Sequence, residues 1–412
     1  MARRTLTLLG PDVMLVAMAG GRPNNAVLVA ECGGRLPAAR VERALEALLP
    51  HAPFLSSRLE RPWPWGRLRW RAVDGRPPLQ RRELAADEGI EAVIDTLLNE
   101  AVDPRRQPPL RVLVVERRDG SRSWLALAWV HALMDPRGAE LLLAMLAGVD
   151  RGGAAQSWAL AQRLEAPLET ADRRRQRRLA RRALERLRAI GRAAPRSLGR
   201  DVARPGRVRH RRLVVPAGAR PLAVTLALVA RAMRALWRAR ELPLDQPFLV
   251  PISVDRRRVG EAGPLFGNFL SFHFARVSAD ADDVAATATA IRQDMAQALR
   301  ADLVDAVWIG MGLARYFSPR QLLRPFGGAV PASFHCADLG EQRPALEMLF
   351  GAPVLDAYHV AGVQPHPGLG VFFSRRGERE SIVAVWVEGV ATPAEVDELL
   401  AAIESGVVAL AA

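Results

Sequence analysis

The sequence predicts an α/β protein built of two similar halves that are joined by a strongly basic connector. Three observations support this prediction. The chain has 412 residues, half of them hydrophobic and a quarter charged, which suffices for two domains of ordinary size. Short apolar runs alternate with helix-like periodic stretches in both parts of the chain. Between these parts, the stretch from Arg173 to Arg212 holds 17 arginines and two acidic residues, Glu185 and Asp201.

The charge distribution sets the expected domain limits. We place the first half at residues 1–165, the connector at 166–206 and the second half at 207–412. The formal net charge is +14, and the basic stretch alone accounts for it, so the rest of the chain is nearly neutral. All 58 basic residues are arginine. The absence of lysine excludes phosphate-loop NTPases, protein kinases and Schiff-base enzymes, because each requires an ε-amine.

Hydrophobic periodicity predicts the individual elements. In the first half we expect strands at 26–31, 68–73, 110–116 and 123–130, and helices at 37–49, 91–101 and 138–146. In the second half we expect strands at 248–254, 268–276, 331–337, 368–374 and 381–387, and helices at 222–240, 281–316 (in two pieces) and 393–405. The run 123–130 is nearly all apolar, which is typical of a strand covered on both faces.

The cysteines and the amino terminus bear on the compartment. Cys32 and Cys336 lie far apart and form no CxxC pair, which argues against a structural zinc site and excludes a disulfide framework. A signal-like apolar start is interrupted at Gly10-Pro11-Asp12. No apolar run reaches the roughly 18 residues that a membrane span requires. We therefore expect a cytoplasmic protein. Peripheral association with the inner membrane stays open as an addition to this expectation.

One short motif points to chemistry. His131 ends the predicted buried strand, Asp135 follows four residues later, and Gly138 opens the next helix. Loops at the carboxyl ends of strands are where reactive groups reach a cleft in α/β proteins. A histidine titrates near neutrality and can act as a general base, and an aspartate can orient the loop or the ring. The alternative interpretation is a core histidine capped by a loop carboxylate.

No serine or cysteine nucleophile accompanies this motif at a recognisable spacing. Cys336 lies next to His335, but nothing in the sequence indicates the lowered thiol pKa that a nucleophile needs. A base without an enzyme nucleophile fits direct attack of a hydroxyl or an amine on an activated acyl group such as a thioester. His273, His359 and His366 are further candidates for the same cavity, although partly buried or surface positions are the favoured interpretation for each of them.

The motif and its surroundings resemble the chloramphenicol-acetyltransferase-like acyltransferase superfamily. This superfamily includes nonribosomal-peptide condensation domains, wax ester synthase/diacylglycerol acyltransferases and polyketide-associated acyltransferases. Its HHxxxDG motif is similar to residues 131–138, and other similar stretches follow in the expected order. They are 40–59 (RVERALEALLPHAPFLSSRL), 108–113 (PPLRVL), 248–256 (FLVPISVDR), 267–271 (GNFLS), 335–340 (HCADLG) and 367–372 (PGLGVF).

The sequence departs from the superfamily pattern at three places. Val130 occupies the position of the first histidine, and Pro136 and Arg137 separate Asp135 from the glycine. The arginine that pairs with the motif aspartate is also displaced, because the matching strand ends in Asp255 and is followed by two arginines. We assign the pairing to Arg256, with its neighbour Arg257 as the alternative.

The resemblance implies two chloramphenicol-acetyltransferase-like halves that form a V around a central tunnel. It implies His131 and Asp135 as catalytic-motif residues, with structural roles near the site for the residues Gly138, Arg256, Gly267 and Asn268. It implies no metal and no permanently bound cofactor. The substrate would be an acyl group on coenzyme A or on the phosphopantetheine of a carrier protein.

The basic stretch is not explained by the resemblance. Leu179, Ala183, Leu187 and Ile190 fall on one side of a helix with arginines elsewhere, a pattern suited to an anionic membrane surface. The same charge would suit an acidic acyl carrier protein or the phosphates of coenzyme A. A solvated linker is the plain alternative. Nucleic acid is disfavoured, because no aromatic residues or binding motif accompany the charge.

These observations together predict an acyltransferase that moves an acyl group from a thioester donor to a hydroxyl acceptor, with His131 as the general base. Two alternatives stay open at this point. The first is a free-standing condensation-type enzyme that forms an amide on a carrier protein. The second is a non-catalytic member that keeps the fold for binding.

Overall fold

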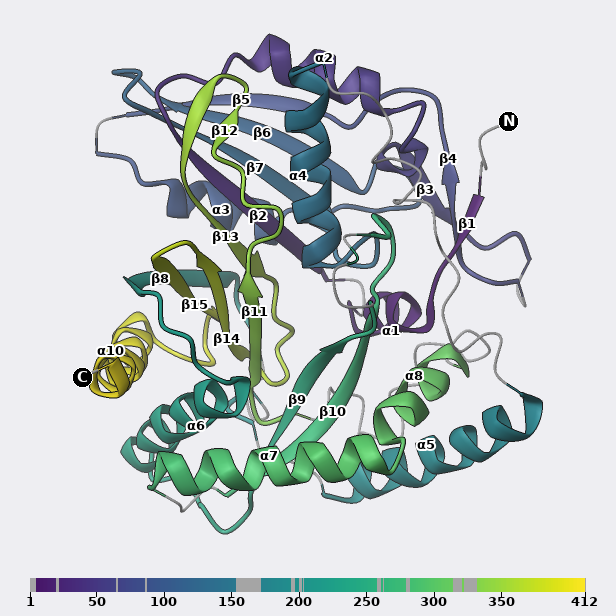
Figure 1. The fold of residues 1–412 in the computed structure, drawn as a ribbon, viewed down its shortest axis with the longest axis vertical. Helices are drawn as coiled ribbons and strands as arrows, with labels where there is room; N and C mark the ends of the chain where they lie inside the picture. The colour runs from purple at the N-terminus through teal and green to yellow at the C-terminus, as the bar shows by residue number, and fades with distance from the viewer. Residues whose placement is uncertain are drawn as a thin grey trace.

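A computed structural model describes residues 5–19, 22–63, 66–85, 87–152, 172–193, 197–199, 202, 204–257, 261, 263–278, 282–313, 321 and 332–411. The first residue and the end of the helix predicted at 281–316, the first residue of the strand predicted from 331 and the side chain of Leu187 lie outside these residues. The described residues form a mixed α/β protein with two main sheets, drawn one above the other in Figure 1. The predicted α/β class is therefore confirmed.

The upper sheet carries the motif. It has six strands in the order β12-β13-β2-β7-β6-β5. Their bounds are β2 (Asn25–Gly33), β5 (Leu79–Leu84), β6 (Leu110–Arg117), β7 (Arg122–Val130), β12 (Met348–Leu349) and β13 (Ala352–Ala361). Strand β13 comes from the second half of the chain but pairs antiparallel with β2 at the centre of this sheet. The second half therefore contributes strands to the sheet of the first half, which the sequence did not predict.

Helices cover both faces of the upper sheet. On β2, Leu28 and Ala30 face a core that includes α2 (Ala38–Leu48) and α4 (Pro136–Asp150). The alternating residues Val27 and Val29 face a second core, which includes α3 (Ile90–Asn99). This period-two alternation between two apolar faces explains why β2, β6 and β7 are nearly all apolar.

The lower sheet has four strands in the order β11-β14-β15-β8. Their bounds are β8 (Val208–Pro216), β11 (His335–Glu341), β14 (Leu369–Arg376) and β15 (Arg379–Val387), and α6 (Leu222–Ala239) and α10 (Pro393–Ala411) complete this region. The separate hairpin of β9 (Phe248–Asp255) and β10 (Leu270–Val277) extends toward the motif, as Figure 1 shows. It joins the lower region to the loop that carries His131.

The amino-terminal segment forms a smaller unit beside the upper sheet. Its three-stranded sheet has the order β1-β4-β3, with β1 (Thr5–Thr7), β3 (Ser57–Glu60) and β4 (Arg69–Ala72), and a single 3-10 turn (Pro53–Leu55) precedes β3. Helix α1 (Gly10–Ala19) follows β1 and packs on α8 (Leu303–Leu313). Helix α7 (Val284–Arg300) precedes α8, so the stretch predicted as helical in two pieces is confirmed over the described residues.

The basic stretch begins as a long helix, α5 (Arg173–Ala193), and the three described side chains of its apolar stripe are buried in the protein. Leu179 and Ala183 are fully buried in a cluster with Ala306 of α8, and Ile190 is also buried. Arg175 adds an ion pair to Asp305 at 3.1 Å. These three side chains therefore hold α5 on the protein and are not available for insertion among lipid headgroups, which corrects that expectation for this part of the stripe. In the part of the chain described, no helix is long and apolar enough to cross a membrane.

This packing gives a stability test on a single helix. Leu179→Ala should lower the free energy of unfolding by about 2–5 kcal/mol, because it leaves a cavity against α8. Leu184→Ala is the matched control, since Leu184 lies on the same helix but is 49% exposed. It should change stability by no more than about 0.5 kcal/mol. Denaturant unfolding measures both, and equal stabilities for the two variants would contradict the packing of α5 on α8.

Candidate active site

His131 is held by its backbone immediately after β7. Its N–H donates to the carbonyl of Asn24 at 2.9 Å, and its carbonyl accepts from Nδ2 of Asn268 at 2.8 Å. Trp129, at the end of β7, also donates from Nε1 to the carbonyl of Met134 at 2.8 Å and so closes the loop. The loop is held by groups on both sides of it, so the backbone from which the imidazole extends is fixed in place.

Asp135 is the N-cap of α4. Its Oδ1 accepts from the N–H of Gly138 at 2.9 Å, which satisfies one of the unpaired donors at the helix start. Pro136 follows at the first helical position, where its missing N–H costs nothing. A side chain at Gly138 would collide with the carbonyl of Leu265. The insertion that separates Asp135 from the glycine is therefore an ordinary helix start, and the glycine is required for close packing.

Arg257, and not Arg256, pairs with Asp135, which corrects the assignment made from the sequence. Nη1 and Nη2 of Arg257 donate to Oδ2 and Oδ1 of Asp135, each at 2.9 Å. Arg256 instead forms an ion pair with Asp305 at 2.8 Å. Neighbouring residues that leave a strand point in different directions, and the geometry selects the second arginine. The guanidinium and the carboxylate are both almost fully buried.

The partners of this buried pair neutralise both charges, although Nε of Arg257 is buried and forms no hydrogen bond to the described residues. The backbone N–H of Phe269 donates to Oδ2 of Asp135 at 3.0 Å, and the Phe269 ring lies 5.3 Å from the guanidinium carbon of Arg257. Burial alone would lower the pKa of Arg257, but Asp135 and Asp255 outweigh it and raise the pKa. The guanidinium therefore stays protonated, and the ion pair holds the loop after β7 against the hairpin β9–β10.

Gly267 and Asn268 lie directly beside the motif. Gly267 adopts a φ of +94°, a conformation that favours glycine, and its N–H donates to the carbonyl of Leu133 at 2.8 Å. Asn268 is buried and bonds both to His131 and to Oδ1 of Asp12, at 2.8 Å. The structure thus brings the residues named from the sequence, apart from Arg256, to one place.

The protonation state of His131 follows from its surroundings. Burial lowers the pKa of His131 below its usual value, and its own carbonyl, the charge of Asp135 and the side chain of Asn268 oppose this only in part. The imidazole is therefore neutral at neutral pH and can accept a proton. Its Nδ1 is buried and forms no hydrogen bond to the described residues.

Two adjoining cavities meet at His131. One, of about 210 Å³, is lined by several charged or polar groups, including Arg137, Asp338 and His359. The other, of about 160 Å³, is bordered by apolar residues of α1, such as Met14 and Leu15. His131 lines both of them, and their shared walls are Ser253, Leu270, Cys336, Ala337, Ala361 and Phe372. Two reactants, one in each cavity, would therefore meet at the imidazole of His131.

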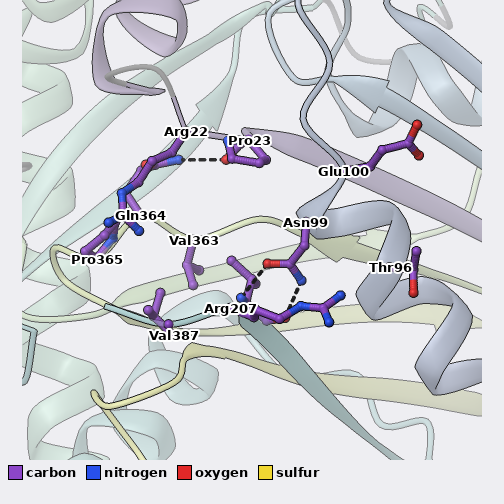
Figure 2. A pocket seen from close by; sticks show the side chains of 12 residues that line it. Arg22, Pro23, Thr96, Asn99, Glu100, Arg207, Val363, Gln364, Pro365 and Val387 are labelled. Atoms are coloured by element: carbon purple, nitrogen blue, oxygen red, sulfur yellow. Dashed lines mark hydrogen bonds between the residues drawn. The ribbon is translucent and has the colours of Figure 1, made fainter. Parts of the chain in front are cut away.

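A third and larger cavity, of about 340 Å³, lies away from the motif (Figure 2). It opens between the end of α3, the start of β8 and the segment after β13, and Arg22 and Arg207 stand on its lining. The amide of Asn99 closes one side by exchanging hydrogen bonds of 2.7 Å with the backbone of Val208. This cavity shares Gln364 with the cavity beside α1 but contains neither His131 nor Asp135.

Three further histidines, His359, His273 and His335, have different surroundings. His359, on β13, lines the polar cavity and contacts Glu140 at 3.1 Å, and Glu140 also accepts from Arg137 at 2.6 Å. His273 pairs with Asp294 at 2.7 Å and is not among the residues that line the described cavities. His335 lines the cavity beside α1, and burial lowers its pKa to about 4.

The cysteine beside His335 is not an activated thiol. Cys336 is free and buried, and its burial, with a smaller contribution from the Asp338 charge, raises its pKa well above the ordinary value. A thiol with a raised pKa is protonated at neutral pH and is a poor nucleophile. Among the described residues, no group of three or more His, Cys, Asp or Glu side chains could hold a metal ion.

Sequence reasoning missed Asp12, Glu140 and Arg137 as members of the site. Arg137 donates to the carbonyls of Glu341, at 2.8 Å, and of Leu339, and so ties the start of α4 to β11. The signals were present, since Asp12 interrupts an apolar run and Glu140 lies on an otherwise apolar helix face. A charge in an apolar context indicates a buried partner but does not identify it.

The buried pair makes a direct prediction. Asp135→Ala should lower the free energy of unfolding by about 3–5 kcal/mol, because it leaves the Arg257 charge buried without its main partner. Asp397→Ala is the control, since its pair with Arg211 is exposed and contributes at most about 1 kcal/mol. Thermal or denaturant unfolding of both variants measures the difference. An Asp135→Ala protein that unfolds like the control would show that the carboxylate is solvated.

Comparisons with known proteins identify the fold. No protein family matches the sequence, and no curated protein does either. Solved structures do match. The first condensation domain of the CDA synthetase is 18% identical, with a TM-score of 0.66, over 97% of this chain and 95% of that one. A variant of the starter condensation domain of rhizomide synthetase RzmA, solved with C8-CoA and Leu-SNAC, is 15% identical with a TM-score of 0.65, over 98% and 94%.

A third likeness extends this set to a different kind of synthetase domain. The EpoB cyclization-docking bidomain from Sorangium cellulosum is 14% identical, with a TM-score of 0.63, over 97% of this chain and 83% of that chain. All three likenesses cover nearly the whole of this chain. The protein therefore has the two-lobed, chloramphenicol-acetyltransferase-like fold of the condensation domains.

Proposed function

We propose that this protein is an acyltransferase that moves an acyl group from a thioester to a hydroxyl acceptor, with His131 as the general base. The observation that carries the proposal is the position of His131, whose imidazole is shared by two adjoining cavities and is neutral at neutral pH. A base between two chambers can act on an acceptor in one chamber and a donor in the other.

The reaction follows from the geometry. Because Nδ1 of His131 is buried, Nε2 is the nitrogen that takes the proton from the acceptor hydroxyl. The oxygen attacks the thioester carbonyl and forms a C–O bond. The C–S bond then breaks, and the leaving thiol takes the proton from the imidazolium. The products are an ester and a free thiol, and the protein returns to its starting state.

Asp135 acts on the position of His131 and does not contact the substrate in this proposal. Its oxygens are occupied by Gly138, Phe269 and Arg257, so it has no role as an acid or base. It holds the loop to the hairpin β9–β10 and thereby aims the imidazole. The structural positions next to it, Gly138, Gly267 and Asn268, serve the same placement.

An amine acceptor is the second candidate. One of the proteins with this fold was solved with both C8-CoA and Leu-SNAC, an acyl donor together with an amino-acid thioester. The same base would then take a proton from the amine as it attacks the thioester, and the product would be an amide. The two versions differ only in the acceptor atom. A screen that offers alcohols and amines with the same acyl donor distinguishes them by the mass of the product.

An acyl carrier protein is the donor partner that the surface favours. Among the described side chains of α5, five arginines are exposed, Arg174, Arg177, Arg178, Arg181 and Arg188, against one exposed acid, Glu185. Positions 174–188 extend for about 20 Å along a helix, which is wider than the phosphates of a single coenzyme A. Acidic protein surfaces are attracted to such a face. We propose that this face docks the acidic carrier, with acyl-CoA as the alternative donor.

His131→Ala tests the central proposal. It should lower turnover about 10²–10⁴-fold, the usual worth of a positioned acid–base group. Circular dichroism and unfolding should match the wild type, because the imidazole supports no part of the core. The measurement is product formation with acyl-CoA and acyl-carrier donors, followed by mass spectrometry. A folded variant with the wild-type rate on the same substrates would favour a non-catalytic binding role.

Charge reversal tests the carrier surface. Changing Arg174, Arg178 and Arg181 to Glu should raise KM for an acyl-carrier donor about tenfold or more and leave KM for acyl-CoA unchanged, because only the carrier spans this face. Changing the exposed Arg58, Arg67 and Arg105 to Glu alters net charge equally and is the control. Equal effects of the two triple variants on KM would show that net charge, and not this face of α5, determines the interaction. A rise confined to acyl-CoA would place the coenzyme, not the carrier, on α5.

A further inference from the structure

A second histidine lines the polar cavity next to His131. His359 lies on β13, is 5% exposed and borders the cavity of about 210 Å³, whereas it is not among the residues that line the cavity beside α1. Cavities that hold a whole small molecule have volumes of about 300–1,000 Å³. The polar cavity therefore takes only part of a reactant, and that part enters a space that both histidines border.

The contacts of Glu140 determine which nitrogen of His359 carries a hydrogen. Nε2 of His359 lies 3.1 Å from Oε1 of Glu140. The other oxygen, Oε2, accepts from Nη1 of Arg137 at 2.6 Å and from the backbone N–H of Arg343 at 3.3 Å. A carboxylate that is paired with a guanidinium only accepts hydrogen bonds. Nε2 of His359 therefore carries the hydrogen and donates it to Glu140.

The same contacts favour an uncharged ring. Glu140 is 3% exposed, and the guanidinium of Arg137 already balances its single negative charge. A second hydrogen on His359 would add a buried positive charge that this ion pair does not balance, and such a charge is costly. In a neutral ring with Nε2–H, the other nitrogen, Nδ1, has a lone pair and acts as a hydrogen-bond acceptor.

This acceptor is buried and has no partner within the described part of the protein. Nδ1 of His359 forms no hydrogen bond to the described residues, and among the residues that line the polar cavity His131 is the other with such a buried atom. Asp338 on the same wall accepts from the N–H of Gly340 at 2.8 Å. Buried polar atoms are paired with few exceptions, so a buried acceptor on a cavity wall indicates a donor that the ligand supplies.

We propose that His359 is a specificity-determining residue that selects a reactant with a hydroxyl group in the polar cavity. Nδ1 of His359 accepts a hydrogen bond from this hydroxyl, while Glu140 holds the ring through Nε2–H. A reactant without the hydroxyl leaves Nδ1 unpaired and binds less tightly. The inference rests on the proposed function, because it assigns this cavity to a reactant of the acyl transfer. The hydroxyl belongs either to the acyl donor or to the acceptor, in addition to the hydroxyl that reacts.

Binding of matched probes tests this selectivity without turnover. The donor probes are octanoyl-CoA and 3-hydroxyoctanoyl-CoA, and the acceptor probes are 1-hexanol and 1,2-hexanediol, each added alone and followed by NMR titration. The wild type should bind the hydroxylated member of one pair about tenfold more tightly, the value of one hydrogen bond, and that pair identifies the reactant. His359→Phe keeps a ring but removes the acceptor, so it should bind both members of that pair equally.

His273→Phe is the matched control. His273 is 3% exposed and its Nε2 contacts Oδ2 of Asp294 at 2.7 Å, so this change also removes a buried histidine with a carboxylate partner. His273 is not among the residues that line the described cavities, and its loss should leave the selectivity unchanged. Loss of selectivity in both variants would trace it to the stability of the fold and overturn the role of His359.

Nitrogen-15 NMR of His359 decides the proposal even if His359→Phe does not fold. The wild-type ring should be neutral with its hydrogen on Nε2, and the Nδ1 signal should shift when the preferred hydroxylated probe is added. In Glu140→Gln the amide oxygen stays on Arg137 and the NH₂ group faces His359, so the hydrogen should move to Nδ1. An Nδ1–H or charged wild-type ring would overturn the proposal, and so would an Nδ1 signal that neither hydroxylated probe shifts.

These outcomes are distinguishable from those of the proposed function. Selective binding of a hydroxylated probe without any turnover would support the assignment of His359 and refute the acyltransferase. Turnover of both members of each pair with equal kcat/KM would keep the proposed function and refute the selectivity.

Discussion

The carboxylate of Asp135 is the constraint on which the arrangement of the site depends. It is fully buried and receives hydrogen bonds from the start of α4, from the Phe269 backbone and twice from Arg257. A buried charge is tolerated only when such partners are complete. Because two of them belong to the segment around the hairpin β9–β10, the loop after β7 reaches its conformation only when both lobes are in contact.

This constraint separates positioning from chemistry. Asp135 and Arg257 neutralise each other inside the protein and present no free acid or base to a substrate. His131 lies next to them, with its backbone held by Asn24 and Asn268 and its ring on the cavities. A neutral imidazole held beside this buried ion pair is suited to accepting one proton and returning it.

The sequence predicted those elements that show a clear local pattern of apolar residues or of helix-start residues. The apolar run before His131 became β7, and the Pro136–Gly138 stretch became the start of α4. Helix α1 was missed because Gly10 and Pro11 indicate a break and its residues are apolar on all sides. Strand β13 was missed because Asp356 and His359 interrupt its apolar run, while its partner β2 lies more than 300 residues away. Arg256 was chosen over Arg257 because the direction in which a side chain leaves a strand cannot be read from adjacent letters.

The position of β13 has a consequence for how the chain acquires its fold. Strand β2 is complete early in synthesis, yet the neighbour on one of its edges is not made until residue 361. Until then β2 is a bare edge of an apolar sheet, which is prone to pairing with other chains. Contacts of this sequence separation also slow folding. The first half is therefore not a self-sufficient unit on the ribosome, and a gene split in the connector would leave its sheet unfinished on one fragment and its missing strand on the other.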